Sequence, residues 1–184
     1  MRVIAGKFKG RQLKAVPGKT TRPTTDKVKE SIYQMLGPYF DDGMVLDLFA
    51  GSGSLGIEAI SRGMSSGVFV DKNPKAIHTI KENIRLLKLQ EHVEIFRADA
   101  FRALKAAAKR KLKFNLILLD PPYKKVDYQK LLKYIIEYEL IEENGLIYCE
   151  HDPQESLIHD DSPLQLIKQD YYGRTIGITI YKKN

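Results

Sequence analysis

Val45-Leu46-Asp47-Leu48-Phe49-Ala50-Gly51-Ser52-Gly53-Ser54-Leu55-Gly56 combines a strand-like apolar run with a glycine-rich turn. A helical pattern follows and continues from Ser54 to Arg62. The three glycines allow a strand to turn sharply and allow the backbone to approach a ligand closely. The helix directs its unpaired N–H groups and the positive end of its dipole at that ligand. A lone glycine motif is a weak signal, so it predicts a nucleotide-like ligand without identifying it.

The composition is that of one soluble globular domain, with 184 residues of which 43% are hydrophobic and 29% charged. No apolar run approaches the roughly 20 residues that a membrane helix needs. Residues 1–7 lack the apolar region of a signal peptide. A single cysteine, Cys149, rules out an internal disulfide and a cysteine-rich metal site. We therefore expect a cytoplasmic, monomeric protein with no metal and no membrane partner.

The net charge of +7 is concentrated at the N-terminus. Residues 1–40 hold nine basic and two acidic side chains, whereas the rest of the chain carries equal numbers of each sign. A basic segment on a neutral body favours a polyanion-binding extension, most often for nucleic acid, over a merely solvated terminus. The candidate nucleic-acid contacts are Lys7, Lys9, Arg11, Arg22 and Thr24.

Hydrophobic periodicity predicts alternating strands and helices after the first 40 residues. Residues 1–20 are typical of a small β-hairpin, and Thr24-Thr25-Asp26 offers an N-cap for a helix whose buried face holds Val28, Ile32, Met35 and Leu36. Further helices are expected at Ser54–Arg62, Pro74–Leu89, Ala100–Arg110 and Tyr128–Tyr138, and strands at Val45–Asp47, Gly67–Asp71, His92–Arg97, Phe114–Asp120, Gly145–Glu150, Leu164–Asp170 and Arg174–Lys182.

This order predicts an α/β fold with a doubly wound, mostly parallel sheet and an antiparallel hairpin at the C-terminus. We divide the chain into a basic extension, residues 1–40, and one globular catalytic unit, residues 41–184.

Four acidic residues are expected at one edge of that sheet, where ligands bind in such folds. They are Asp47, Asp71, Asp99 and Asp120, each at or just after a strand. Asp71 follows Gly51 by 20 residues, the spacing of a carboxylate that binds a ribose diol, and Asp99 could accept from an adenine amine. Asp71 and Asp99 could equally be helix N-caps. The predicted cofactor contacts are Asp47, Phe49, Ala50, Gly51, Ser52, Gly53, Asp71, Lys72, Asp99 and Ala100.

Up to this point a nicotinamide dehydrogenase and an S-adenosylmethionine enzyme fit equally well. Asp120-Pro121-Pro122-Tyr123 separates them, because it resembles the D/N-P-P-Y/F motif of methyltransferases that act on exocyclic amines. Such an amine is a poor nucleophile, since its lone pair is delocalised into the ring. If Asp120 and the Pro121 carbonyl accept hydrogen bonds from its two N–H groups, the lone pair of the nitrogen can be directed at the methyl donor. The prolines stiffen the turn, and Tyr123 can stack on the base.

The chain resembles the RsmD-like bacterial methyltransferases, which modify the N2 amine of guanine in small-subunit (16S) ribosomal RNA. The matching blocks span essentially the whole chain: Arg2-Val3-Ile4-Ala5-Gly6, Arg22-Pro23-Thr24-Thr25-Asp26, Asp47-Leu48-Phe49-Ala50-Gly51-Ser52-Gly53, Asp120-Pro121-Pro122-Tyr123 and Tyr172-Gly173. The resemblance implies a class I, Rossmann-like methyltransferase fold, S-adenosyl-L-methionine as cofactor, and a guanine in assembled or assembling small ribosomal subunits as target. The family usually has Ala where Ser54 stands, and often Glu in place of Asp71.

Two other functions stay open at this stage. An adenine-N6 methyltransferase acting on DNA or RNA shares the tetrapeptide, although only about 40 residues lie outside the catalytic unit to recognise a sequence. A non-catalytic nucleotide- or RNA-binding module is the second, and the intact Asp120 and Tyr123 argue against it. Arg22, Thr24 and Asp26 either order the entry over the donor or cap the first helix, and His151 is a candidate supporting residue.

Overall fold

The computed structural model describes residues 1–18, 25–157 and 162–184. In chain order its elements are α1 (Asp26–Leu36), β1 (Met44–Asp47), α2 (Ser54–Ser61), β2 (Ser66–Asp71), α3 (Pro74–Leu86), β3 (Val93–Arg97), α4 (Ala100–Lys109), β4 (Phe114–Leu119), α5 (Tyr128–Glu137), β5 (Ile141–His151), β6 (Leu164–Tyr172) and β7 (Ile176–Lys183).

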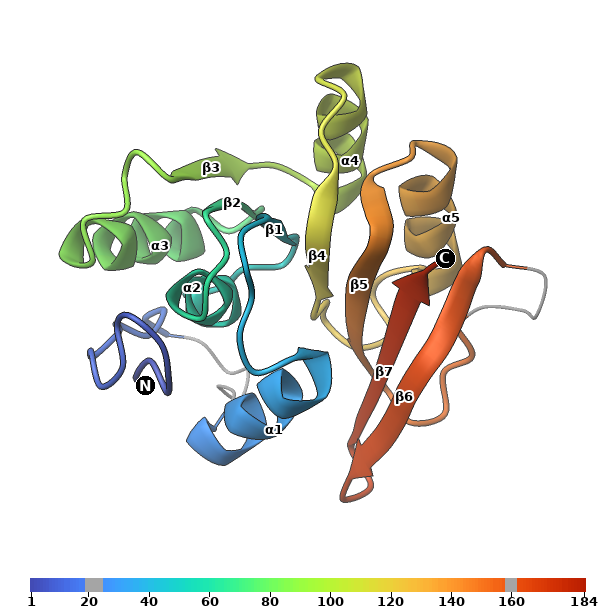
Figure 1. The fold of residues 1–184 in the computed structure, drawn as a ribbon, viewed down its shortest axis with the longest axis horizontal. Coiled ribbons are helices and arrows are strands. Elements are labelled where there is room, and N and C mark those ends of the chain that lie inside the picture. The colour runs from blue at the N-terminus through green and yellow to red at the C-terminus, as the bar shows by residue number, and fades with distance from the viewer. Residues whose placement is uncertain (19–24, 158–161) are drawn as a thin grey trace.

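One seven-stranded sheet organises the fold, in the order β3-β2-β1-β4-β5-β7-β6. Strands β1 to β5 pair in parallel, whereas β7 is antiparallel to both β5 and β6. Figure 1 shows the β6–β7 hairpin at one side of the molecule and β3 at the other. The predicted doubly wound sheet with an antiparallel C-terminal hairpin is therefore confirmed.

Helices cover both faces of the sheet, because successive strand residues point to opposite sides. Val45 and Leu118 pack in one core cluster with residues of α1, α2 and α3. Their neighbours Leu46 and Leu119 pack in a second cluster with residues of α4 and α5. In Figure 1, α1–α3 lie on the opposite side of the sheet from α4 and α5. No helix in the described ranges is long and apolar enough to cross a membrane.

The N-terminal arm, residues 1–18, lies against α2 and α3. Its two halves run antiparallel, with a bridge between Arg2 and Gln12 and a hydrogen bond of 3.0 Å from the Val3 amide to the Arg11 carbonyl. The predicted hairpin is thus present as antiparallel pairing, although neither half forms a regular strand. Val3 and Leu13 are buried in the same cluster as α1–α3, so this part of the basic extension belongs to the core.

Most element ends differ from the predicted ones by one or two residues, and α3 and β5 differ by more. Helix α3 ends at Leu86 rather than Leu89, and Lys88 has a positive φ of 58°. Strand β5 begins at Ile141 instead of Gly145, with a register irregularity against β4 before the regular pairing. Helix α1 buries Lys29, Ile32, Tyr33 and Leu36, so the predicted burial of Ile32 and Leu36 is confirmed, whereas Val28 and Met35 are partly buried against the same core.

Strand β6 forms the outer edge of the sheet next to β7. Its pairing with β7 shifts register between Leu166 and Lys168. Leu166 and Ile167 are exposed there, at 52% and 43% of their surface. The edge strand is therefore irregular at its most apolar point.

Gly56 sets how closely α2 packs on β2, and this gives a first prediction. A Cβ added at Gly56 would lie 1.8 Å from Cε1 of Phe69, which is fully buried. We expect Gly56→Ala to lower the free energy of unfolding by about 3 kcal/mol, measured by urea denaturation, because overpacking of a core is costly.

Gly10→Ala is the matched control. Gly10 has a φ of +83° with nothing within 4 Å of an added Cβ, so only backbone strain of about 1 kcal/mol is expected. A second change, Phe69→Leu, removes the clashing ring atom and should partly restore the Gly56→Ala variant. Equal effects of the two alanine substitutions would contradict the packing argument.

Candidate active site

The candidate site lies where the strand order of the sheet reverses. The chain proceeds from β1 outward to β2 and β3, then returns to β4 on the other side of β1. In such sheets the crevice at the reversal, beyond the carboxyl ends of the strands, is where ligands bind. Asp47 pairs with Leu118 in neighbouring strands. The loop after β1 and the tetrapeptide Asp120–Tyr123 after β4 therefore leave the sheet side by side.

The glycine loop, residues 50–53, is a tight turn between β1 and α2. The Gly53 amide donates to the Ala50 carbonyl at 2.7 Å, and Gly51 and Gly53 have φ angles of +57° and +85°. Gly53 is the N-cap of α2 and supplies no side-chain cap to the first turn of that helix. Nothing lies within 4 Å of a Cβ built on Gly51. The loop thus presents bare backbone and open space at the helix N-terminus.

Two of the predicted acidic residues hold this loop in place. The Asp47 carboxylate accepts from the Gly56 amide at 3.0 Å, and the Asp71 carboxylate accepts from the Gly51 amide at 2.9 Å. The second oxygen of Asp71 accepts from the Asn73 amide at 2.9 Å. Sequence spacing alone did not indicate that Asp71 holds the backbone of the loop and that Asp47 holds the first turn of α2.

The N-cap alternative applies to Asp99 but not to Asp71. Asp99 caps α4 by accepting from the Phe101 amide at 2.8 Å. Helix α3 is instead capped by Asn73, which accepts from the Lys75 amide. Asp99 is exposed, as is Lys72, whereas Ala100 is buried as the first residue of α4. Phe49 and Ser52 are half-buried beside the loop.

Burial changes the protonation of Asp47, which is only 2% exposed. Desolvation raises the pKa of its carboxyl from 3.8 to about 7, although the Gly56 hydrogen bond opposes the shift and the nearby Asp71 charge adds to it. Around neutral pH the folded protein therefore contains a mixture of protonated and ionised Asp47.

The tetrapeptide begins directly after β4, and the residue before it, Leu119, is hydrogen-bonded to Tyr128. Pro121 is buried, while Asp120 and Tyr123 are half-buried. The Tyr128 hydroxyl lies 2.9 Å from the Leu119 carbonyl and 2.6 Å from the Glu150 carbonyl. A single buried phenol thus joins the end of β4, where the tetrapeptide starts, to the end of β5.

The structure describes three of the five candidate nucleic-acid contacts. Lys7, Lys9 and Arg11 are exposed on the arm, and the Arg11 guanidinium donates to the Leu86 carbonyl. Arg22 and Thr24 fall outside the described residues. Asp26 begins α1 and forms an ion pair with Arg2 at 2.8 Å. The N-cap of α1 is Thr25, whose hydroxyl accepts from the Val28 amide.

Three fully buried polar side chains were not predicted from the sequence: Lys29 and Asn83 beside the loop, and Glu58 within α2. Lys29 lies on the apolar stripe of α1, three residues before Ile32, and Asn83 lies on that of α3, three residues after Ile80. A polar residue at a position that helical periodicity assigns to the core is the signal that could have identified them.

His151 and Cys149 are both buried side chains of β5. His151 is buried, with Nδ1 2.8 Å from the Asp152 carbonyl and Nε2 2.8 Å from the Thr179 hydroxyl. Because a carbonyl oxygen can only accept, Nδ1 carries a proton. Burial raises the pKa of the Cys149 thiol well above its usual range. In the part of the chain that is described, no three His, Cys, Asp or Glu side chains are grouped as a metal site requires.

The raised pKa of Asp47 predicts a pH dependence of stability. The unfolded chain loses this proton near pH 4 but the folded chain keeps it until about pH 7, so ionisation favours unfolding as the pH rises through that window. Asp47→Asn cannot titrate, and the Asn side-chain oxygen can still accept from the Gly56 amide. Between pH 4 and 7 the natural protein should therefore lose up to about 4 kcal/mol of unfolding free energy that the variant keeps. Urea denaturation at several pH values measures this, and parallel profiles would contradict it.

Comparisons with known proteins agree with this geometry. Residues 1–182 match the family model described as "Conserved hypothetical protein 95". A putative rRNA methyltransferase of Bacillus subtilis is 55% identical over 183 residues, which cover 100% of this chain and 99% of the relative. The ribosomal RNA small subunit methyltransferase D of Haemophilus influenzae is 32% identical over 99% of this chain and 92% of its own length.

The solved structure of a putative methyltransferase from Escherichia coli is similar to the whole chain. It superposes with a TM-score of 0.86 at 27% identity and covers 100% of this chain and 98% of the other. The predicted class I methyltransferase fold is thereby confirmed. The chain belongs to the family described as "Conserved hypothetical protein 95", which is the RsmD family of methyltransferases that its motifs predict.

Proposed function

We propose that the protein transfers a methyl group from S-adenosylmethionine to the exocyclic N2 amine of a guanine in small-subunit ribosomal RNA, in assembled or assembling subunits. The observation that carries this proposal is the position of Asp120–Tyr123 beside the glycine loop at the strand-order reversal. The names of the relatives support ribosomal RNA as the substrate class. The choice of guanine rests on the resemblance of the motifs.

In this proposal the glycine loop and its neighbours hold the donor. The N-terminus of α2 faces the donor's carboxylate end, where N–H groups and the helix dipole favour an anion. Each Asp71 oxygen accepts one backbone N–H, and an ionised carboxylate has about four acceptor sites, so Asp71 retains capacity for ribose hydroxyls. Asp99 accepts from the adenine amine. The residues present therefore fit an adenosyl donor.

The tetrapeptide prepares the amine. Asp120 and the Pro121 carbonyl accept hydrogen bonds from its two N–H groups and so direct its lone pair toward the methyl group. The prolines restrict the turn, and Tyr123 stacks on the guanine. When bound, S-adenosylmethionine supplies a methyl group that is already activated by its positively charged sulfur. The amine nitrogen forms a bond to that methyl group while the sulfur–methyl bond breaks and leaves its electron pair on the sulfur, and the nitrogen then releases one proton. Positioning therefore provides most of the catalysis, and no strong base is needed.

The deciding experiment offers labelled S-adenosylmethionine to the protein with small subunits, naked ribosomal RNA and DNA, followed by analysis of the labelled nucleoside. N2-methylguanine from small-subunit RNA is the expected product. Methyladenine as the sole product would instead establish the adenine-N6 alternative, and donor binding without transfer to any substrate would establish a binding module.

Asp120 is expected to act on the amine and not on the donor. Asp120→Ala should retain donor affinity within about twofold in calorimetry but lower the rate of methyl transfer by at least about 100-fold, as loss of a positioning contact does. Asp127→Ala is the control, because Asp127 is an exposed N-cap of the nearby helix α5. Loss of donor binding in Asp120→Ala would contradict its assigned role.

Lys7, Lys9 and Arg11 are expected to contact phosphates. Replacing all three by Gln should weaken RNA binding and reduce the slope of log affinity against log salt by up to about 2, since each phosphate contact contributes roughly 0.7–0.9. Titrations at several salt concentrations measure the slope. The control replaces Lys109, Lys111 and Lys113, which are exposed from the end of α4 to the start of β4, on the other face of the sheet from the arm. An unchanged slope in the arm variant would mean that the arm does not contact RNA.

A further inference from the structure

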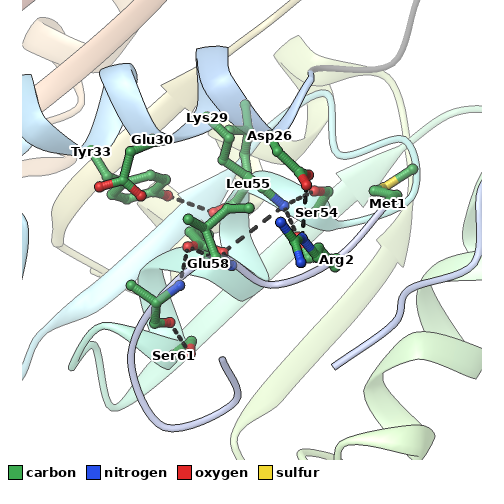
Figure 2. A network of polar contacts seen from close by, with 12 residues as sticks. Met1, Arg2, Asp26, Lys29, Glu30, Tyr33, Ser54, Leu55, Glu58 and Ser61 are labelled. Atoms are coloured by element: carbon green, nitrogen blue, oxygen red, sulfur yellow. Dashed lines mark hydrogen bonds and ion pairs between the residues drawn. The ribbon is translucent and has the colours of Figure 1, made fainter. Parts of the chain in front are cut away.

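The arm and the glycine loop share two buried side chains, although the two segments are separate in sequence. Part of the arm is anchored to α2 at residues beyond its first turn: the Ile4 and Ala5 amides donate to Glu58, and the Ser61 hydroxyl donates to the Ala5 carbonyl. Lys29 and Asn83 differ from these anchors, because Asn83 also bonds the loop at Ser52 and Lys29 also bonds Ser54, the residue that follows it. Figure 2 shows the first of the two, Lys29, between the arm and the start of α2.

Lys29 extends from α1 and ends between the arm and the first residue of α2. Its ammonium donates to the Arg2 carbonyl at 2.6 Å and to the Ser54 hydroxyl at 2.9 Å, and it lies 3.9 Å from the Glu58 carboxylate. Burial lowers the pKa of Lys29, while the Glu58 charge opposes that shift. One ammonium thus joins the arm backbone to the residue that follows the glycine loop.

Asn83 makes the corresponding connection from α3. Its amide nitrogen donates to the Ser52 carbonyl at 2.9 Å and to the Lys14 carbonyl at 3.0 Å, and its amide oxygen accepts from the Lys14 amide at 2.8 Å. Ser52 lies between the two glycines of the loop, so this bond fixes the orientation of the peptide plane there. Every polar atom of the Asn83 side chain is used by the loop or the arm.

Full burial makes these connections depend on one another. Neither side chain can replace a lost protein partner with bulk water unless the surrounding packing opens. If the arm leaves α2 and α3, Lys29 loses the Arg2 carbonyl and Asn83 loses both bonds to Lys14. The two groups that hold the loop must then reorient or become hydrated. The loop conformation that receives the donor is therefore stabilised by the docked arm.

We propose that Lys29 and Asn83 are positioning residues that couple docking of the arm to the geometry of the donor-binding loop. Because such coupling is reciprocal, donor binding stabilises the docked arm by the same factor by which the docked arm raises donor affinity. The docked arm exposes Lys7, Lys9 and Arg11 on its outer side. RNA that binds a docked arm through these residues thereby raises affinity for the donor. This last step rests on the proposed function, whereas the coupling between arm and loop does not involve RNA.

Amide hydrogen exchange of the full chain tests the coupling, with S-adenosylhomocysteine as the probe. Saturating probe should slow exchange in residues 2–14 by about 10-fold in the natural protein, within the usual range of coupling between sites. In Asn83→Ala and in Lys29→Met this ratio should fall to about twofold or less. The peptide from α5 serves as the internal reference, and calorimetry measures binding of the probe in every variant.

The controls separate coupling from stability. Asn115→Ala removes an exposed amide that accepts from the Met44 amide, and Lys27→Met removes an exposed lysine from the same helix as Lys29. Both should keep the full ratio. If Asn83→Ala and Lys29→Met exchange faster with and without the probe by one common factor, their role is only structural and the proposal is overturned. If Lys29→Met does not fold, Asn83→Ala alone decides.

The same measurements separate this proposal from the proposed function. A natural protein that binds S-adenosylhomocysteine with no change in arm exchange would overturn the coupling and leave the methyltransferase function intact. A natural protein that does not bind the probe in calorimetry would overturn the function together with the coupling.

Discussion

The parallel pairing of β1 with β2 on one side and β4 on the other is the constraint on which the remaining structure depends. Parallel neighbours cannot be joined by a tight turn, so the chain must return through a helix after each strand. All the loops that follow strands then emerge at one edge of the sheet. The glycine loop and the tetrapeptide become neighbours because β1 and β4, which are far apart in sequence, pair directly. The strand topology thus brings the two loops of the candidate site together, whatever side chains they carry.

A buried polar cluster then attaches α1 and the arm to this framework. The Arg62 guanidinium donates to Glu58 of α2 at 3.0 Å and to Glu30 of α1 at 3.1 Å. Its central carbon lies 4.9 Å from the ring centre of Tyr33. Burying such charges opposes folding unless each is paired and hydrogen-bonded. The arrangement therefore joins α1, α2 and the arm through groups that are each paired. Lys29 and Asn83 add connections to Ser54 and to the loop.

The order of strands and helices could be predicted from sequence because a strand covered on both faces is an unbroken apolar run, as in Leu116–Leu119, and a helix repeats its apolar residues with its own period, as in Ile77, Ile80 and Ile84. The sequence also located the glycine loop and the tetrapeptide, whose prolines and glycines have strong local effects. It did not identify the partners of that loop. Charge at Lys29 suggests an exposed position, and only the tertiary contact with Arg2 and Ser54 explains its burial. The loop-binding role of Asp71 likewise depends on which strand lies beside β1.

The irregular edge at β6 has a consequence for the protein at high concentration. An edge strand presents unpaired N–H and C=O groups to which the strand of another copy can add, and exposed Leu166 and Ile167 would strengthen such an association. The register shift beside them interrupts the row of backbone groups, and the exposed charge of Lys168 follows at once. A second sheet cannot continue the ladder across this point without burying that lysine. The fold thus carries, at the edge farthest from β3, its own protection against edge-to-edge aggregation.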